Sequence, residues 1–337
     1  MMSASAPASA DVLIVIPCLN EEANLSRLLD HFLADAPSAE IVVADGGSTD
    51  RSHAIVRDFQ HRHPNLPLID NPRRIQSAGV NLAVTTMGRG RKWLLRVDAH
   101  CDYPAGYMAG LLDSAARHEA SSVVVPMITT GRDCFQRACA SAQNSLIGTG
   151  GSPHRHIGEG RFVDHGHHAL MRIDLFLAVG GYRENQSHNE DAELDLRLQA
   201  AGARIWLEPR QAIVYHPRKT PLALLRQYFR YGDGRARTMR LHGTKLKARQ
   251  ALPLLVPIAL AMLLLAPFHP LFALPALGWA SICLFYGLLI GLKARSHCVA
   301  ASGVAAMLMH LGWGAGYLYQ QFRPRPSDRR LPALVLR

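Results

Sequence analysis

The pattern of apolar and polar positions divides the chain into two parts. Over the first 130 residues, short β-branched apolar segments alternate with segments whose apolar residues recur at helical spacing. In segment 21–35, for example, one helical face carries Leu25, Leu28, Leu29 and Phe32. Alternating strands and helices are typical of a mostly parallel sheet with helices on both faces. We therefore predict an α/β fold for this part.

The expected strands end in residues that suit a binding site. The strands are 11–17, 40–45, 66–70 and 92–98, and the helices between them are 21–35, 50–62 and 75–86. A further helix and two short strands are expected at 189–202, 204–209 and 212–216. Ligands bind beyond the carboxyl ends of strands in such sheets. We therefore expect Pro17, Asp45 and Asp98 at one common edge.

The C-terminal part shows long apolar segments without charge. Residues 251–292 contain no Asp, Glu, Lys or Arg, and neither do residues 298–321. A bilayer crossing needs about 20 mainly apolar residues, so the first segment is long enough for two crossings and the second for a third. Buried helices of a soluble core are the alternative, but these are usually shorter and polar on one face. We predict a membrane region with two to three transmembrane helices.

A basic cluster precedes the apolar segments. The net charge is +11, and the single acid Asp233 lies among Arg226, Arg230, Arg235, Arg237, Arg240, Lys245, Lys247 and Arg249. Such a cluster beside a membrane segment favours anionic headgroups. Nucleic acid is the competing partner, but no zinc-finger spacing or aromatic-rich RNA-binding surface accompanies the charge. We expect a membrane partner and no nucleic acid.

The N-terminus and the cysteines suggest a reducing compartment. "MMSASAPASA" has no basic residue and no apolar core, unlike a secretory signal, so we expect the first 250 residues in the cytoplasm. The six cysteines are scattered and form no CxxC pair. This argues against a disulfide framework or a structural zinc site.

An Asp-x-His pair marks the end of the fourth strand, in "LLRVDAHCDYP". Asp98 and His100 are suited to a divalent metal at the edge of a sheet, but an ordinary strand-ending turn has the same composition. Neither GxGxxG nor GxxxxGK[ST] occurs in the chain, which argues against a dehydrogenase or an ATPase. The pair alone leaves both interpretations open.

Four motifs in register resemble the inverting glycosyltransferases of family 2, which have the GT-A fold. They span roughly residues 11–235 and read VLIVIPCLNEEANL, VVADGGSTDRS, LLRVDAH and HNEDAELDLRLQAAG. The phrases RVDAHCDYP, FVDHGHHALMR and RQYFRYGDGRART resemble more closely the succinoglycan-biosynthesis glucosyltransferase subfamily, which works on bacterial exopolysaccharides. The resemblance implies a hexosyltransferase with a nucleotide-diphospho-sugar transferase fold.

The resemblance assigns residues that bind the nucleotide-sugar. Pro17, Leu19 and Glu21 match the family's P-x-Y-N-E segment, which contacts the nucleotide, with Leu19 in place of the usual Tyr. Asp45 matches the acid that recognises uracil, and the nearby Gly47 permits close approach of the backbone to a ligand.

The resemblance also implies a divalent metal, Mg²⁺ or Mn²⁺. Asp98 and His100 match the family's metal-binding Asp-x-Asp, with imidazole replacing the second carboxylate. Because imidazole suits later transition metals better, His100 either ligates Mn²⁺, acts through a water or hydrogen-bonds the diphosphate. His216 is a further possible ligand, although an ordinary strand-end histidine is the favoured interpretation.

The catalytic base is implied by the Glu-Asp motif. Glu190 and Asp191 match it. Asp191 is the residue that would deprotonate the acceptor hydroxyl, and Glu190 is expected to contact the acceptor or the diphosphate. Acids in the first turn of a helix also stabilise its dipole, so Glu193 and Asp195 need no functional role.

Two further segments are expected on the acceptor side. In the His-rich segment, Gly166 and His168 are expected to contact the sugars, and His165 and His167 share the other face of a strand; we expect no zinc site there. Gln227, Arg230 and Tyr231 match the Q-x-x-R-W motif of membrane polysaccharide synthases, with Tyr in place of Trp. They are expected to contact the acceptor or the diphosphate, and an interfacial amphipathic helix is the alternative.

The implied function is transfer of a sugar, with glucose expected, from a UDP-sugar to a lipid-diphosphate-linked glycan. The enzyme would lie in the bacterial inner membrane with its catalytic domain on the cytoplasmic side, beside other polysaccharide-assembly enzymes. The alternatives are a polyprenyl-phosphate glycosyltransferase, a processive synthase, or a non-catalytic membrane scaffold with a GT-A fold. The presence of both Asp98 and Asp191 argues against the scaffold.

The predicted organisation leaves one conflict in topology. It comprises a flexible N-terminus, a GT-A domain, a basic interfacial segment, a membrane region and a basic tail at 1–10, 11–220, 221–250, 251–321 and 322–337. Three crossings place Lys293 and Arg295 inside, as the positive-inside rule requires, but place the basic tail outside. One apolar segment then does not cross, and the first is the candidate because it contains Pro253, Pro257, Pro267 and Pro270.

Overall fold

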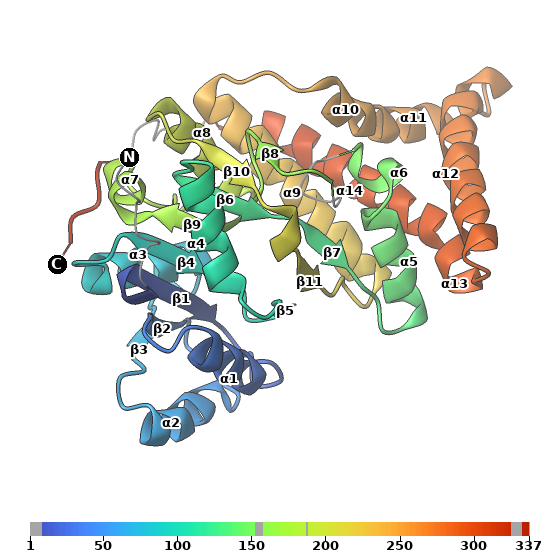
Figure 1. The fold of residues 1–337 in the computed structure, drawn as a ribbon. Helices are drawn as coiled ribbons and strands as arrows, with labels where there is room; N and C mark the ends of the chain where they lie inside the picture. The colour runs from blue at the N-terminus through green and yellow to red at the C-terminus, as the bar shows by residue number, and fades with distance from the viewer. Residues whose placement is uncertain (1–8, 152–157, 187, 325–331, 337) are drawn as a thin grey trace. The chain divides into compact units, whose positions relative to one another are not determined.

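The computed structural model describes residues 9–151, 158–186, 188–324 and 332–336, which form two compact units (Figure 1). The first unit comprises the described residues of 1–127, 157–214 and 330–337, and the second those of 128–156 and 215–329. The described residues 128–151 therefore belong with the C-terminal part of the chain. The expected domain boundaries stay predictions.

The first unit is built on a mixed sheet. Its strand order is β3-β2-β1-β4-β9-β6-β10-β8 among the described residues. The strands are β1 Val12–Cys18, β2 Glu40–Asp45, β3 Leu68–Asp70, β4 Trp93–Arg96, β6 Ser122–Val125, β8 Arg161–Phe162, β9 His167–Arg172 and β10 Ile205–Leu207. Strands β1–β4 pair in parallel, whereas β9 lies antiparallel between β4 and β6.

Helices follow the strands as the alternating pattern predicts. They are α1 Leu25–Asp35, α2 Ser52–Arg62, α3 Gln76–Met87, α4 Tyr107–Arg117, α7 Ile173–Ala178 and α8 Glu190–Ala200, with 3-10 turns at Ser9–Asp11 and Pro209–Gln211. Side chains alternate across a strand, so one sheet face presents Leu13, Val15, Val42 and Leu94 to a core shared with α3, α7 and α8. This buried layer holds the strand ends in place.

The register brings the carboxyl ends of the first strands together. Cys18 lies opposite Asp45, which in turn lies opposite Asp70. The backbone N–H of Val97 donates to the carbonyl of Val15 at 3.0 Å, which extends β4 alongside β1. The expected common edge is therefore confirmed for the backbone at Pro17, Asp45 and Asp98.

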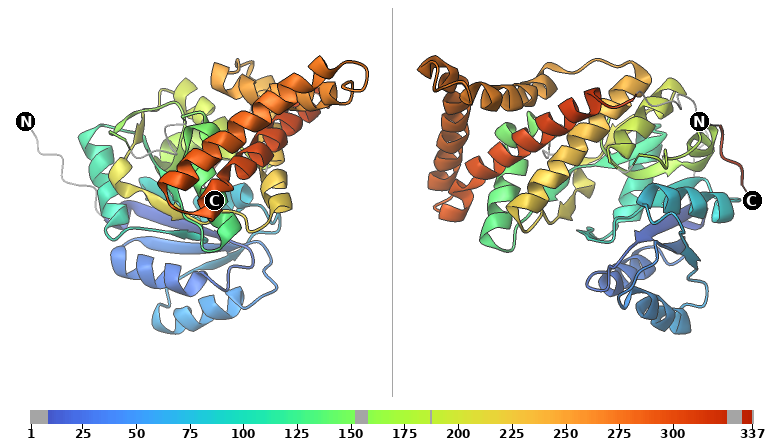
Figure 2. Two further views of the ribbon diagram at one scale, coloured as in Figure 1. Left: turned by 90° about the vertical axis from the view of Figure 1, so that its right-hand side faces the viewer. Right: turned by 180° about the vertical axis from the view of Figure 1, so that it is seen from behind.

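The second unit is mainly helical. Its helices are α5 Cys134–Gln143, α6 Leu146–Thr149, α9 Pro221–His242, α10 Ala248–Ala251, α11 Leu255–Leu263, α12 Leu274–Lys293, α13 His297–Ala300 and α14 Ser302–Gln321, with 3-10 turns at Leu252–Leu254 and Pro270–Ala273. Figure 2 shows α9 and α14 side by side along much of their length. The boundary between the units falls within two short strands, β7 Met127–Thr129 and β11 Ile213–Tyr215, and β5 covers Cys101–Asp102.

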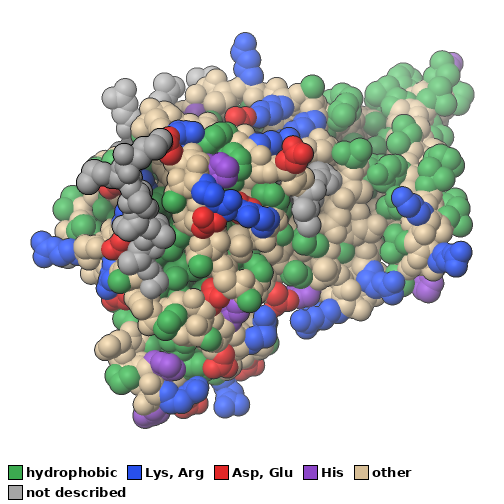
Figure 3. Space-filling model, viewed as in Figure 1, with side chains coloured by type: hydrophobic (Ala, Val, Ile, Leu, Met, Phe, Trp, Pro, Cys, Tyr) green, Lys and Arg blue, Asp and Glu red, His purple; other side chains and the backbone are tan. Residues whose placement is uncertain are grey.

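Within the described ranges, two helical segments are long and apolar enough to cross a membrane: Pro270–Lys293 and His297–Gln321. A third apolar segment, Ala248–Leu263, is shorter. Apolar side chains dominate the surface around α12 (Figure 3). The number of membrane-crossing helices stays a prediction.

The cysteine prediction was wrong at one pair. Cys134 of α5 and Cys298 of α13 form a disulfide across a sequence separation of 164 residues. The spacing of the cysteines in the sequence does not indicate this pair, because the two helices meet only in the folded second unit. The other four cysteines are buried thiols.

Candidate functional site

The turn after β2 is organised by the Asp45 carboxylate, which is 2% exposed. It accepts hydrogen bonds from the backbone N–H groups of Gly47 at 2.7 Å and Ser48 at 2.9 Å, and from the Ser48 hydroxyl at 2.5 Å. His53 Nε2 lies 2.7 Å from the same carboxylate. Burial would raise the pKa of Asp45, but the bonds from Ser48, His53 and the backbone outweigh it and lower the pKa. The residue is therefore an anion that shapes its loop, and its contact with uracil stays a prediction.

The loop after β1 is joined to this turn. Asn20 has a positive φ of 58°, its N–H donates to Ser48 Oγ at 2.8 Å, and its Oδ1 accepts from the N–H of Thr49 at 2.8 Å. Asn20 therefore links the two loops, and Asn24 occupies the N-cap of α1.

The predicted nucleotide-contacting residues lie in β1, in the loop that follows it and in the turn after β2. Pro17 is in β1, Leu19 is exposed beyond its end, and the Glu21 carboxylate accepts from Asn24 Nδ2 at 2.9 Å. Gly47 has a φ of +83°, in the left-handed region that favours glycine. No contact with a nucleotide is tested by this geometry, so these roles stay predictions.

Asp98 follows β4 and is surrounded by donors. Its Oδ1 accepts from Gln76 Nε2 at 2.7 Å, and its Oδ2 lies 3.5 Å from Arg96 Nη2 and 3.4 Å from His167 Nε2. Tyr103 OH accepts from the Asp98 backbone N–H at 2.7 Å. Burial would raise the pKa of Asp98, but Arg96, His167, His100 and Gln76 lower it to about 2. The carboxylate is therefore ionised at neutral pH.

His100 and Asp98 contact different partners. Its side chain is 52% exposed, and its Nδ1 lies 3.5 Å from Glu21 Oε1. The motif thus connects the loop after β1 with the loop after β4.

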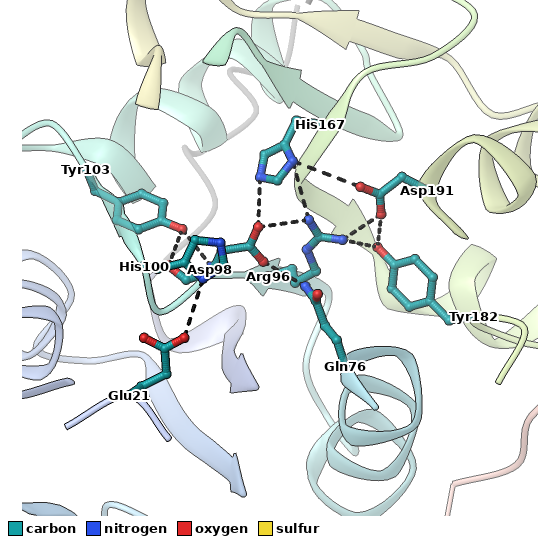
Figure 4. Close-up of polar contacts among 9 residues, drawn as sticks. All are labelled: Glu21, Gln76, Arg96, Asp98, His100, Tyr103, His167, Tyr182 and Asp191. Atoms are coloured by element: carbon teal, nitrogen blue, oxygen red, sulfur yellow. Dashed lines mark hydrogen bonds and ion pairs between the residues drawn. The ribbon is translucent and has the colours of Figure 1, made fainter. Parts of the chain in front are cut away.

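Asp191 lies in the first turn of α8 and shares an arginine with Asp98 (Figure 4). Its Oδ1 accepts from Arg96 Nη1 at 2.5 Å and from Tyr182 OH at 2.9 Å, and its Oδ2 lies 4.0 Å from His167 Nδ1. Arg96 is 3% exposed and also donates to Tyr182 OH at 3.1 Å. Burial alone would lower the pKa of Arg96, but Asp191 and Asp98 raise it. One buried cation therefore joins the two predicted acids; we call Arg96, Asp98, His167, Tyr182 and Asp191 the Arg96 network.

Three members of the network were not predicted as site residues. A signal existed for Arg96, because residues two apart on a strand share a face and Arg96 precedes Asp98 by two. Tyr182 carried no such signal, since its approach to Asp191 depends on the path of the chain between α7 and α8. His167 was noticed only as part of the His-rich segment.

Two histidines of the His-rich segment contact two different carboxylates. His167 contacts Asp98, whereas His165 Nδ1 lies 2.8 Å from Asp195 Oδ2. The expectation of no zinc site there stays a prediction. A Cβ on Gly166 would collide with the Val124 side chain, so close packing alone requires glycine there. The side chain of His168 lies outside the described residues, and its sugar contact and that of Gly166 stay predictions.

The other acids of α8 separate into two kinds. Burial and the adjacent Asp191 carboxylate raise the pKa of Glu190 to about 8, so this side chain holds its proton at neutral pH. Glu193 is fully buried and pairs with Arg197 at 2.6 Å and Arg183 at 3.2 Å. Glu193 therefore has a structural role, and no functional role was expected for it.

The predicted acceptor residues of the second unit lie on α9. Gln227 Nε2 donates to Tyr215 OH at 3.0 Å and to Tyr231 OH at 2.9 Å, and Arg230 is exposed. His216 Nδ1 lies 3.1 Å from the Thr130 carbonyl, which is consistent with an ordinary strand-end histidine. The functional roles of Gln227, Arg230 and Tyr231 stay predictions.

The donor atoms near Asp98 fit a divalent cation in kind. Mg²⁺ and Mn²⁺ prefer oxygen ligands, and imidazole is acceptable to later metals. Asp98 supplies an ionised carboxylate, and Glu21 and His100 add an oxygen and a nitrogen. Among residues that the structure describes, however, the one close group of three ligand atoms belongs to Cys134, His297 and Cys298, two of which share the disulfide. The metal at Asp98 stays a prediction.

Comparisons with known proteins identify the family of this chain. Residues 13–180 match the family described as Glycosyl transferase family 2. The chain is 47% identical over 319 residues to the succinoglycan biosynthesis protein ExoA of Rhizobium meliloti (strain 1021), covering 94% of this chain and 96% of that protein. It is 27% identical over 117 residues to the dolichyl-phosphate beta-glucosyltransferase ALG5A of Trichomonas vaginalis (strain ATCC PRA-98 / G3), covering 32% and 31% of the two chains.

A solved structure shares the fold. The mannosyltransferase PcManGT from Pyrobaculum calidifontis, solved with GDP-Man and Mn²⁺, superimposes with a TM-score of 0.53 at 19% identity, covering 94% of this chain and 89% of that one. At this identity the likeness concerns the fold alone. Together with the sheet order, it confirms the prediction of a GT-A-like α/β fold.

Proposed function

The chain is a member of glycosyltransferase family 2, and on that premise we propose that it is an inverting enzyme of bacterial exopolysaccharide synthesis. It transfers a sugar, glucose in our proposal, from a UDP-sugar to a lipid-diphosphate-linked glycan. The printed name of the Rhizobium relative supports a role in polysaccharide assembly. The GDP-Man in the PcManGT complex supports a nucleotide-sugar donor.

The observation that carries the proposal is the position of Arg96 between Asp98 and Asp191. The guanidinium lies 3.5 Å from one carboxylate and 2.5 Å from the other. The predicted donor-side acid and the predicted base are thereby fixed within one network. This network supports transfer between a nucleotide-sugar and an acceptor hydroxyl, a reaction in which the two reactants must be held in a fixed orientation.

The chemistry assigned to this chain is deprotonation and orientation. The acceptor oxygen bonds to the anomeric carbon from the face opposite the diphosphate, and the carbon–oxygen bond to the diphosphate breaks with its electron pair leaving on UDP. The hydroxyl proton passes to the Asp191 carboxylate, which Arg96 and Tyr182 hold in orientation. A base in this position accelerates transfer by about 10²–10⁴-fold. Attack from the opposite face inverts the anomeric configuration.

A divalent cation, Mg²⁺ or Mn²⁺, completes the proposal. Asp98 would hold it, with His100 and Glu21 as the nearest further donors. When bound, it supplies positive charge that stabilises the departing diphosphate. The Mn²⁺ in the PcManGT complex supports this assignment.

The proposed location is the inner membrane, with the catalytic unit on the cytoplasmic side and other polysaccharide-assembly enzymes nearby. Two apolar helices support membrane association. The eight basic residues between 226 and 249 favour anionic lipid headgroups. Gln227, Arg230 and Tyr231 are proposed to contact the acceptor or the diphosphate.

A second acceptor class is a polyprenyl phosphate. The similarity to a dolichyl-phosphate beta-glucosyltransferase favours it, over the 32% of this chain that the match covers. The two acceptors differ by one phosphate and by the presence of a glycan, so the same assay separates them.

The proposal is tested by UDP release from membranes that contain the full chain. A panel of UDP-sugars is offered with a lipid-diphosphate glycan or a polyprenyl phosphate, in Mg²⁺, Mn²⁺ or chelator. Asp191→Asn is compared with Asp58→Asn, a control on the exposed surface of α2. We expect release with one donor that requires metal and Asp191 but not Asp58. Release unaffected by Asp191→Asn contradicts the assigned base, and silence with every donor and acceptor contradicts the transferase.

A further inference from the structure

The two candidate membrane helices of the second unit have different surroundings. In the most apolar part of Pro270–Lys293, 17% of the residues are buried, against 44% for His297–Gln321. Large exposed apolar side chains cover α11 and α12, among them Leu255, Ile258, Leu277, Ile282, Phe285 and Leu292. Figure 3 shows hydrophobic side chains gathered on this part of the surface, between patches of backbone and other side chains. Lipid is the partner that suits such a surface, because 251–292 contains no charged residue.

α14 packs against protein along much of one side. Ala306 and Met309 of α14 share a buried cluster with Ala138 of α5 and with Leu224 and Tyr228 of α9. His310 Nε2 lies 2.7 Å from the carbonyl of Ile147 in α6. One face of α14 therefore belongs to the core of the second unit.

Glycines bring the backbones of α14 and α9 into contact. A Cβ on Gly312 would lie 2.6 Å from the Leu225 carbonyl oxygen, and a Cβ on Gly316 would collide with the Phe229 carbonyl. In the other direction, a Cβ on Gly232 would collide with the Trp313 carbonyl. No lipid chain fits between helices packed this closely. Wherever α14 lies relative to the membrane, α9 lies there too.

α9 is too polar for the bilayer interior. Its 22 residues include Arg226, Arg230, Asp233, Arg235, Arg237 and Arg240. Charged side chains at the centre of a bilayer are costly and rare. If α14 crossed, this set of charges would have to cross with it.

The connection between the two candidate spans also lies beside polar protein. Cys298 is bonded to Cys134 at the start of α5, and Arg137 Nη2 donates to Ser296 Oγ at 3.4 Å. α5 carries the charged Arg137 and is preceded by Asp133, which caps it. Proximity of residues 134 and 298 holds whether or not their thiols are oxidised. The end of α12 is thereby fixed on the side of the membrane where α5 lies.

We propose that α11 and α12 enter the bilayer as a hairpin and that α14 does not cross but stays with α9 on the catalytic side. α12 rises about 30 Å over its 20 residues, enough for the hydrocarbon core. Segment 248–263 rises about 24 Å and is continued by the apolar residues up to Phe268. Lys293, Arg295 and the basic tail then all lie inside, which satisfies the positive-inside rule. The segment that does not cross is therefore the last one, whereas the prolines had pointed to the first.

This inference concerns the membrane partner of the proposed function and does not depend on sugar transfer, so it is testable even in the Asp191→Asn chain. Single cysteines are placed in the full chain at three exposed positions, by Asp58→Cys, Ala294→Cys and Arg323→Cys. Membrane-impermeant maleimide is added to right-side-out and to inverted vesicles, with the unsubstituted chain as background. We expect all three cysteines to react from the same, cytoplasmic face.

Each other labelling pattern overturns the proposal. Reaction of Ala294→Cys from the face opposite to Asp58→Cys means that only one of segment 248–268 and α12 crosses, so that no hairpin forms. Reaction of Arg323→Cys from the face opposite to Ala294→Cys means that α14 crosses. The chain must also stay in membranes washed with alkaline carbonate, and its release would show that the α11–α12 hairpin is not embedded.

A cross-link supplies an independent arm of the test. After mild oxidation of the membranes, peptide mapping should find residues 134 and 298 linked, and Cys298→Ser should abolish the link. Absence of the link in the unsubstituted chain would contradict the position of α13 beside α5.

Discussion

The loops after β2 and β4 each hold an ionised aspartate at the same sheet edge, but they neutralise it differently. Asp45 is 2% exposed, and its hydrogen-bond partners lie mainly in its own turn: Gly47, Ser48 and the nearby His53. Asp98 is contacted by side chains from distant parts of the sequence: Gln76, Arg96 and His167. A carboxylate bound by local backbone donors fixes a loop, whereas one that shares a cation with a second carboxylate couples two sides of a site.

Removing the shared cation should have the largest effect on stability. Arg96→Met leaves Asp98 and Asp191 without their common partner, and breaking a buried ion pair costs about 3–5 kcal/mol. We expect a drop of that size in the free energy of unfolding of the detergent-solubilised chain. Arg96→Lys keeps the charge but loses the planar fork that reaches both acids, so it should restore part of the stability and little of the UDP release. Equal stability of Arg96→Met and the unsubstituted chain would contradict the network.

Removing the Asp45 carboxylate should reduce stability less than removing Arg96, and it should mainly weaken binding of the UDP-sugar. Asp45→Ala deletes an acceptor of several hydrogen bonds, and each bond to a charged group contributes about 1.5–3 kcal/mol. The truncation leaves space in which water can bind the freed polar donors of the turn, so we expect a loss near the lower end of that range. The KM for the UDP-sugar should rise more than kcat falls. A fall in kcat at unchanged KM would place Asp45 with Asp98 and remove the contrast between the two loops.

The proton on Glu190 should affect stability in a way that is visible only as a pH dependence. Its pKa rises from 4.5 to about 8 in the folded chain, so the folded state binds the extra proton between these values. The stability contributed by the protonated form is complete below about pH 4.5 and is lost as pH rises through about 8. Glu190→Gln should remove this loss. Denaturation curves of both chains from pH 5 to pH 9 should therefore diverge, with the unsubstituted chain losing relative stability; parallel curves would contradict the shift.

The sequence predicted the elements of this edge better than their contacts. Alternation of strands and helices indicated the α/β fold, and strand ends indicated the places of Asp45 and Asp98. The contact of His167 with Asp98 depends on β9 lying antiparallel between β4 and β6, a pairing that periodicity does not reveal. The contacts of Tyr182 and Asp191 with Arg96 depend on the path of the chain between α7 and α8, which the sequence pattern does not reveal either.

The apolar segments show the same limit. Composition made 251–292 and 298–321 equally suited to a bilayer, because it does not distinguish lipid from protein as the apolar neighbour. The packing of Gly312 and Gly316 against α9, and the pairing of Cys134 with Cys298, appear only once the helices are placed.

The most direct test of the central claim separates binding from transfer in Asp191→Asn. Donor binding is measured by displacement of a fluorescent UDP analogue, and single-turnover transfer to the lipid acceptor is measured on the same membranes. Because Asn retains the shape of the side chain but cannot take the hydroxyl proton, we predict unchanged donor affinity and transfer slowed by about 10²–10⁴-fold. Donor binding lost in proportion to transfer would contradict the account, since Asp191 would then hold the donor and not deprotonate the acceptor.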